Sequence, residues 1–130
     1  MYKNVEMVCE EDLTIFTFKK SLDFQEFIEI FKGFYNANPT KYIIFDMSRG
    51  DLKNITPEQI EIASETLKNN FHKRPAGAKT AFVVLGFDDL GVLKSYRFWN
   101  IIKDVKLNSK IFHNYNDAIE WIRDGFRATI

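Results

Sequence analysis

Apolar runs of two kinds divide the chain into predicted strands. Residues 42–45 (YIIF) form an unbroken run of β-branched and aromatic side chains, and residues 80–85 (TAFVVL) form a second, largely apolar run. Such runs are typical of strands buried on both faces, as in the middle of a parallel sheet. Leu13–Phe18 (LTIFTF) instead alternates, after the weakly alternating residues 3–9, and predicts an N-terminal hairpin. Residues 110–113 are predicted to form a short final strand.

Between these strands, apolar residues recur at three- and four-residue steps, the spacing of amphipathic helices. The first helix is expected to start at Ser21 or Asp23. Thr56 is expected to cap the second, in a capping box with Gln59 and with Pro57 at the first helical position. The apolar stripes of these two helices are Phe24, Phe27, Ile28, Phe31 and Phe34, and Ile60, Ala63, Leu67 and Phe71.

Two further helices complete the pattern. One is predicted from Asp88 or Asp89 to about Lys103, and the other over residues 117–126, capped by Asn114 or Asn116. The element order is therefore ββαβαβαβα, with crossovers of about thirty residues, the length that right-handed βαβ units need. We predict one α/β domain over residues 1–130, with a mostly parallel sheet of about five strands.

Composition narrows the classes of function. The 18 basic and 18 acidic side chains cancel, so no net field attracts the chain to nucleic acid or an anionic membrane. There is no apolar window of membrane-spanning length and no secretory signal pattern, so we expect a protein that does not span a membrane and is cytoplasmic. The single Cys9 excludes an internal disulfide and a multi-cysteine zinc site, and we expect its thiol to be buried and inert.

Candidate catalytic chemistry is sparse. His72 ends a predicted helix and is expected to be a capping or solvated residue. His113 ends the last predicted strand, where α/β folds keep their sites, and could act with Asp46 or Asp88 in a small enzyme. No nucleophile, phosphate-binding or cofactor motif accompanies it, so we predict no catalytic residue and no cofactor.

A metal site is not predicted either. Asp46, Asp88 and Asp89 all follow predicted strands and could gather near one magnesium ion. Their spacing does not guarantee that their oxygens converge, and helix capping is a sufficient explanation for Asp88 and Asp89.

The aromatic residues of the C-terminal half exceed what single apolar helix faces need. Trp121 falls off the stripe of its helix, and Tyr96, Phe98 and Trp99 cannot all face one side of theirs. These four side chains would suit a pocket for an apolar small molecule or lipid, or a surface for a partner. The alternative is an aromatic-rich core that covers both sides of these helices.

Two stretches carry a family resemblance that spans about two-thirds of the chain. One is YIIFDMSRGDLKNITPEQ, with an apolar strand, an Asp-x-Ser turn and a short loop to a capped helix. The other is GAKTAFVVLGFDDLGVLKSYRFW, followed by KIFHNYNDAIEWI. In order and spacing they resemble the STAS fold, the class of the sporulation anti-sigma-factor antagonists, and within it a divergent branch that is also similar to lipid-binding Sec14-like folds.

The resemblance implies a regulatory, non-enzymatic module with a protein partner. Our first hypothesis places the partner surface on the loops of residues 48–56 and 86–91 and the adjoining helix starts, with Ser48, Asp51, Thr56, Asp88 and Asp89 as its candidate residues. In typical family members a serine at the start of the helix after the Asp-x-Ser strand is phosphorylated, which switches partner binding. The family's Asp-Ser-Ser-Gly is replaced here by residues 54–57 (NITP). Thr56 is then the candidate phosphorylation site, with pure helix capping as the alternative.

Overall fold

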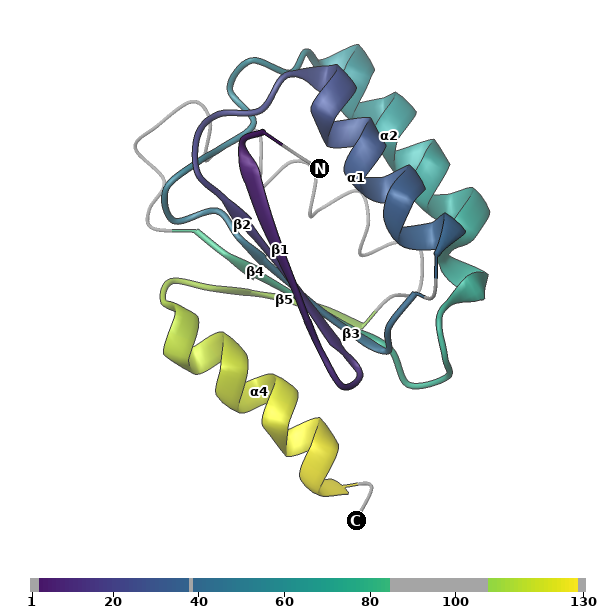
Figure 1. Ribbon diagram of the computed structural model, residues 1–130, viewed down its shortest axis with the longest axis vertical. Coiled ribbons are helices and arrows are strands. Elements are labelled where there is room, and N and C mark those ends of the chain that lie inside the picture. Colours follow the sequence, from purple (N-terminus) through teal and green to yellow (C-terminus); the bar gives the residue numbers. More distant parts are fainter. Residues whose placement is uncertain (1–2, 38, 85–107, 129–130) are drawn as a thin grey trace.

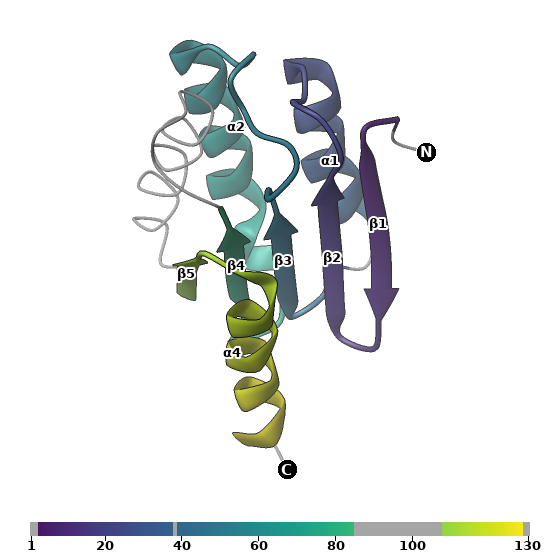
Figure 2. The ribbon, with the colours of Figure 1, turned by 90° about the vertical axis from the view of Figure 1, so that its left-hand side faces the viewer.

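The computed structural model describes residues 3–37, 39–84 and 108–128, and places five strands in one sheet (Figures 1 and 2). The strand order follows the sequence: β1 (Val5–Glu10), β2 (Leu13–Phe18), β3 (Tyr42–Asp46), β4 (Lys79–Val83) and β5 (Asn108–Phe112). β1 is antiparallel to β2, and all other neighbours are parallel. The predicted α/β class and mostly parallel five-stranded sheet are confirmed.

Helices cover both faces of the sheet. Figure 1 shows α1 (Phe24–Asn36) and α2 (Pro57–Asn70) side by side on one face and α4 (Tyr115–Ala128) on the other. A short 3₁₀ helix, η1 (Phe71–Lys73), follows α2. The predicted helix from residues 88 or 89 to about 103 lies outside the described residues. Within the described part of the chain, no helix has the length and apolarity to cross a membrane.

The apolar core is divided into two clusters by the sheet. Alternation along β2 sends Phe16 and Phe18 toward α1 and α2, and Leu13 toward α4, as predicted. Residues 42–45 of β3 are all buried, because this central strand is covered on both faces. The ring of Phe45 stacks between those of Phe16 and Phe82, with centroid distances of 5.4 and 5.2 Å.

Helix caps follow local sequence. Asp23 caps α1, since its carboxylate accepts from the backbone N–H of Glu26 at 2.8 Å. Asn114 precedes α4 and accepts from the backbone N–H of Asp117 at 2.8 Å. The sequence left two candidates for each of these caps. In each case the cap is the residue whose side chain accepts a hydrogen bond from the backbone N–H three positions later.

Three expectations need correction. Cys9 is exposed, because β1 is an edge strand of which only Val5 is buried. The last strand ends at Phe112 and begins at Asn108, so His113 lies just beyond it. Phe71 lies in η1 and is half-buried, since α2 ends one residue earlier.

At the amino ends of β3 and β4, the guanidinium of Arg74 is buried in a set of neutral acceptors. It donates to the carbonyl oxygens of Thr40 (3.3 Å), Lys41 (2.8 Å) and Lys79 (2.9 Å) and to the hydroxyl of Thr80 (2.6 Å). Arg74 thereby joins the segment after η1, the entry to β3 and the start of β4.

Candidate functional site

The carboxyl ends of the parallel strands meet at one edge of the sheet, where open α/β folds place their sites. Just beyond β3, the backbone N–H of Met47 donates to the carbonyl of Val83 at 2.9 Å. Just beyond β4, the N–H of Val84 donates to the carbonyl of Phe112, also at 2.9 Å. Met47 and Val84, the residues directly after β3 and β4, therefore lie beside the ends of β4 and β5, and we call this edge the rim.

The Asp-x-Ser turn at the end of β3 is closed on itself. The carboxylate of Asp46 accepts from both the backbone N–H (3.1 Å) and the hydroxyl (2.7 Å) of Ser48. Tyr115, at the start of α4, lies within electrostatic reach: burial raises the pKa of its hydroxyl, and the negative charge of Asp46 raises it further. Ser48 is half-buried, and its hydroxyl serves the turn.

Asp51 fastens the loop after β3 to the loop before α1. Its carboxylate accepts from the hydroxyl of Ser21 (2.7 Å) and the backbone N–H of Lys53 (3.0 Å). Its own carbonyl accepts from the N–H of Leu22 at 3.2 Å. Gly50 lets the two loops approach, because a Cβ at this position would overlap the carbonyl of Lys20.

We expect Gly50→Ala to lower the free energy of unfolding by about 2–4 kcal/mol, since the methyl group meets backbone rather than a movable side chain. Urea denaturation would measure this loss as a lower midpoint concentration, while the dependence of the unfolding free energy on urea concentration stays unchanged. Gly77→Ala is a useful contrast: its strain comes from a positive φ of 81°, and its nearest neighbour is the flexible end of Lys41. A fully stable Gly50→Ala protein would show that the two loops are not in contact.

Thr56 occupies the N-terminus of α2 and is exposed, whereas Ser48 and Asp51 are half-buried. Its hydroxyl accepts from the backbone N–H of Gln59 (3.2 Å), and the side chain of Gln59 accepts from the N–H of Thr56 (2.9 Å). The predicted capping box is confirmed. The exposed hydroxyl also lies where the partial positive charge of a helix N-terminus favours an anion.

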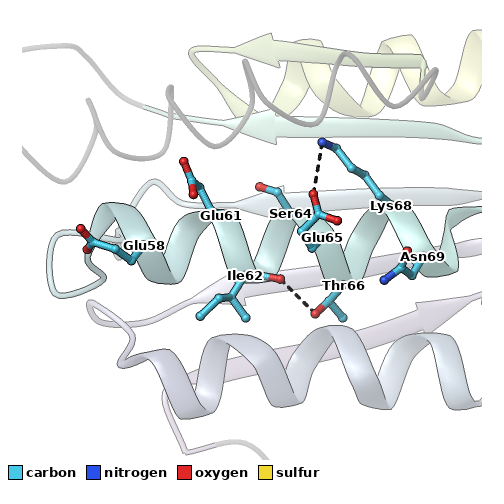
Figure 3. Close-up of a pocket in the computed structure, with 8 residues that line it drawn as sticks. All are labelled: Glu58, Glu61, Ile62, Ser64, Glu65, Thr66, Lys68 and Asn69. Carbon is cyan, nitrogen blue, oxygen red and sulfur yellow. Dashed lines mark hydrogen bonds and ion pairs between the residues drawn. The ribbon is translucent and has the colours of Figure 1, made fainter.

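An open groove of about 720 Å³ runs along the outer side of α2 (Figure 3). The described residues that line it all belong to this helix: Glu58, Glu61, Ile62, Ser64, Glu65, Thr66, Lys68 and Asn69. Glu65 pairs with Lys68 at 3.6 Å, and Ile62 is 52% exposed. The groove combines acidic side chains, of which Glu58 is the first after Thr56 in sequence, with an exposed aliphatic one.

The remaining predicted site residues are divided between the described and undescribed parts of the chain. Asp88, Asp89, Tyr96, Phe98 and Trp99 lie outside the described residues. Trp121 is half-buried. Its ring lies 5.6 Å from the ring of Phe112, and the ammonium of Lys79 lies 4.8 Å from the Trp121 ring centroid. The apolar-ligand pocket of these aromatics stays a prediction.

The side chain of His113 contacts the rim. Its Nδ1 lies 3.1 Å from the carbonyl oxygen of Val84, which ties the segment after β5 to the segment after β4. His72 is exposed in η1. Among the described residues, no group of three or more His, Cys, Asp or Glu side chains could hold a metal ion.

Two contributors to this edge were missed from the sequence. From its local sequence, Ser21 is only a candidate start of α1, and Gly50 is only part of the polar turn after residues 42–45. Each acts on a residue about thirty positions away, Ser21 on Asp51 and Gly50 on Lys20. No local pattern encodes either contact.

Comparison with known proteins identifies the fold. No protein-family model matches the sequence, and no curated protein does. Among solved structures, the chain is similar to an anti-sigma factor antagonist from Mycobacterium paratuberculosis, with a TM-score of 0.60 over 92% of each chain and 9% sequence identity. The chain therefore has the fold of an anti-sigma factor antagonist, and the STAS-like fold implied by the resemblance is confirmed.

Proposed function

We propose that this protein is a non-enzymatic regulatory module that binds a protein partner at the rim, around Thr56. The observation that carries the proposal is the exposed hydroxyl at the N-terminus of α2, directly after the loop that leaves the central strand. The similar solved structure is an anti-sigma factor antagonist. In this proposal Asp46, Ser48 and Asp51 shape the loop, and Thr56 faces the partner.

Phosphorylation of Thr56 would act on this surface without unfolding the helix. The phosphate oxygens can still accept the N–H groups at the start of α2, so the helix keeps its cap. The added negative charge would stand two residues before Glu58, which lines the groove together with Glu61 and Glu65. A phosphate inside the docking surface is repelled by these like charges and loses its water when the partner docks, so phosphorylation weakens partner binding.

We expect Thr56→Asp to reduce binding of that partner by about tenfold or more, and Thr56→Asn to leave binding within about twofold. Asp and Asn cap helices about equally well, so the pair differs in charge but not in helix stability. The measurement is quantitative mass spectrometry of proteins captured from native cells by the tagged wild-type chain and by each variant, followed by titration of the purified partner.

Equal thermal unfolding midpoints for the two variants serve as the folding control. A charge reversal at Asp51 would be a less specific test, because Asp51→Lys also removes the contact with Ser21 that holds the loop. If Thr56→Asp and Thr56→Asn capture the same proteins in the same amounts, Thr56 does not face a partner and the proposed surface is wrong.

A further inference from the structure

β1 leaves one side of the sheet open. It is the first strand in the order, and among the described residues no strand pairs with its outer side (Figure 2). Proteins commonly protect such edges with proline, charged side chains (lysine above all) or a bulge. The sequence of β1, VEMVCE, contains no proline or lysine and has Glu6 and Glu10 as its charges, and its pairing with β2 is continuous from Val5 to Glu10. Met7 is 49% and Val8 37% exposed.

The backbone groups that point away from the sheet can be assigned. The carbonyl of Asn4 accepts from the N–H of Lys19, its partner in the register of the hairpin, at 2.8 Å. Hydrogen-bonded pairs alternate along an antiparallel ladder, so Glu6, Val8 and Glu10 direct their backbone groups to β2. The N–H and C=O groups of Val5, Met7 and Cys9 therefore point outward, where a further strand can bind them.

We propose that a second copy of this chain occupies this edge, with the two β1 strands antiparallel about a two-fold axis at Met7. Met7 then faces Met7 of the second copy, and Val5 faces its Cys9. Each of these pairs joins outward-pointing groups and can exchange two backbone hydrogen bonds. The two sheets become one continuous sheet, and the exposed Met7 side chains meet on one face.

Charge selects this register over its neighbours. A shift of two residues in one direction places Glu6 opposite Glu6 of the second copy, and a shift in the other places Glu6 opposite Glu10. Like charges directly opposite each other destabilise a strand pair. In the proposed register Glu6 faces Val8. Lys3 and Glu11 lie just outside the two ends of β1 and are both exposed, so the antiparallel pairing brings these opposite charges to the same end of the paired strands. A shift of one residue would match outward-pointing groups with inward-pointing ones.

Disulfide trapping tests the register. In a Cys9→Ser background, Met7→Cys places the new thiols on the two-fold axis, within the Cα separation of about 5.5 Å that a disulfide accepts. Glu10→Cys in the same background lies on the same strand, but its two thiols would be about 20 Å apart. We expect Met7→Cys to give covalent dimers on mild oxidation about tenfold faster than Glu10→Cys, by non-reducing electrophoresis.

Charge exchange tests the same contact without a cross-link. By analytical ultracentrifugation over a concentration series, the wild-type chain should populate a dimer. Lys3→Glu should weaken it about tenfold, and the double variant Lys3→Glu with Glu11→Lys should restore it. Equal cross-linking rates for the two cysteine variants, a wild-type chain that stays monomeric throughout, or no rescue in the double variant would each overturn the proposal. The test does not involve Thr56, so its outcome is independent of the proposed function.

Discussion

Replacement of Phe45 with alanine is expected to lower the free energy of unfolding by about 3–5 kcal/mol. The ring of Phe45 is 4% exposed and is the meeting point of the larger core cluster. It stacks between the rings of Phe16 and Phe82. The ring of Phe31, from α1, is tilted relative to it, at a centroid distance of 5.8 Å. Alanine would remove these contacts on three sides and leave a cavity. The neighbouring rings belong to two strands and a helix, so they cannot all move in to fill it.

Chemical denaturation of Phe45→Ala and of Ile62→Ala would measure the effect with a matched surface control. Ile62 is an apolar residue of α2 that is 52% exposed, and its replacement should change stability by less than about 0.5 kcal/mol. Phe45→Leu, which retains much of the apolar volume, should fall between the two. A loss below about 1.5 kcal/mol for Phe45→Ala would mean that the core relaxes around the cavity and that the stacked rings are not tightly packed.

The burial of residues 42–45 could be predicted because a run without polar interruption has no face to turn to water. The capping box at Thr56 and the turn at Asp46 could also be read locally, since each closes within three residues. Cys9 was placed wrongly because weak alternation looks the same in an edge strand as in a covered one. Only the strand order shows that β1 lies at the edge of the sheet.

The candidate site shows the same division. The sequence pointed to the strand ends, because parallel strands carry their C-terminal loops to a common edge. It could not show that Asp51 is bound by Ser21 from another loop. This contact depends on how two loops pack, which no spacing within either loop specifies. Together with the local bond between Ser48 and Asp46, it moves the expected partner contact away from Asp51 and Ser48 and toward Thr56.

Arg74 is the residue whose importance the sequence concealed most completely. It stands between Lys73, the last residue of η1, and Pro75, as one of three successive basic side chains after α2. Yet it is 6% exposed. Burial lowers the pKa of its guanidinium, an effect opposed by the neighbouring hydroxyl of Tyr35. The ring of Phe34 lies 6.0 Å from its central carbon. The acceptors that hold the charge are mainly backbone carbonyls, which leave no mark in a sequence.

Arg74→Met is expected to lower the free energy of unfolding by about 3–5 kcal/mol. Removing a buried ion pair together with its partner can be neutral, but here the partners are parts of the backbone and remain when the cation is removed. The methionine fills part of the volume and donates nothing, so the part-buried carbonyls of Thr40 and Lys79 lose this donor. Urea denaturation provides the measurement, with Arg49→Met, at an exposed position of the loop after β3, as the control.

Arg74→Lys separates charge from geometry. Lysine keeps the positive charge, but its single ammonium cannot reach acceptors that surround a planar fork on several sides. We therefore expect the lysine variant to lose most of what the methionine variant loses, about 2–4 kcal/mol. A lysine variant as stable as the wild-type chain would show that the site requires only a cation. In that case the hydrogen bonds from one guanidinium to the entry of β3 and the start of β4 would not be what holds this end of the sheet together.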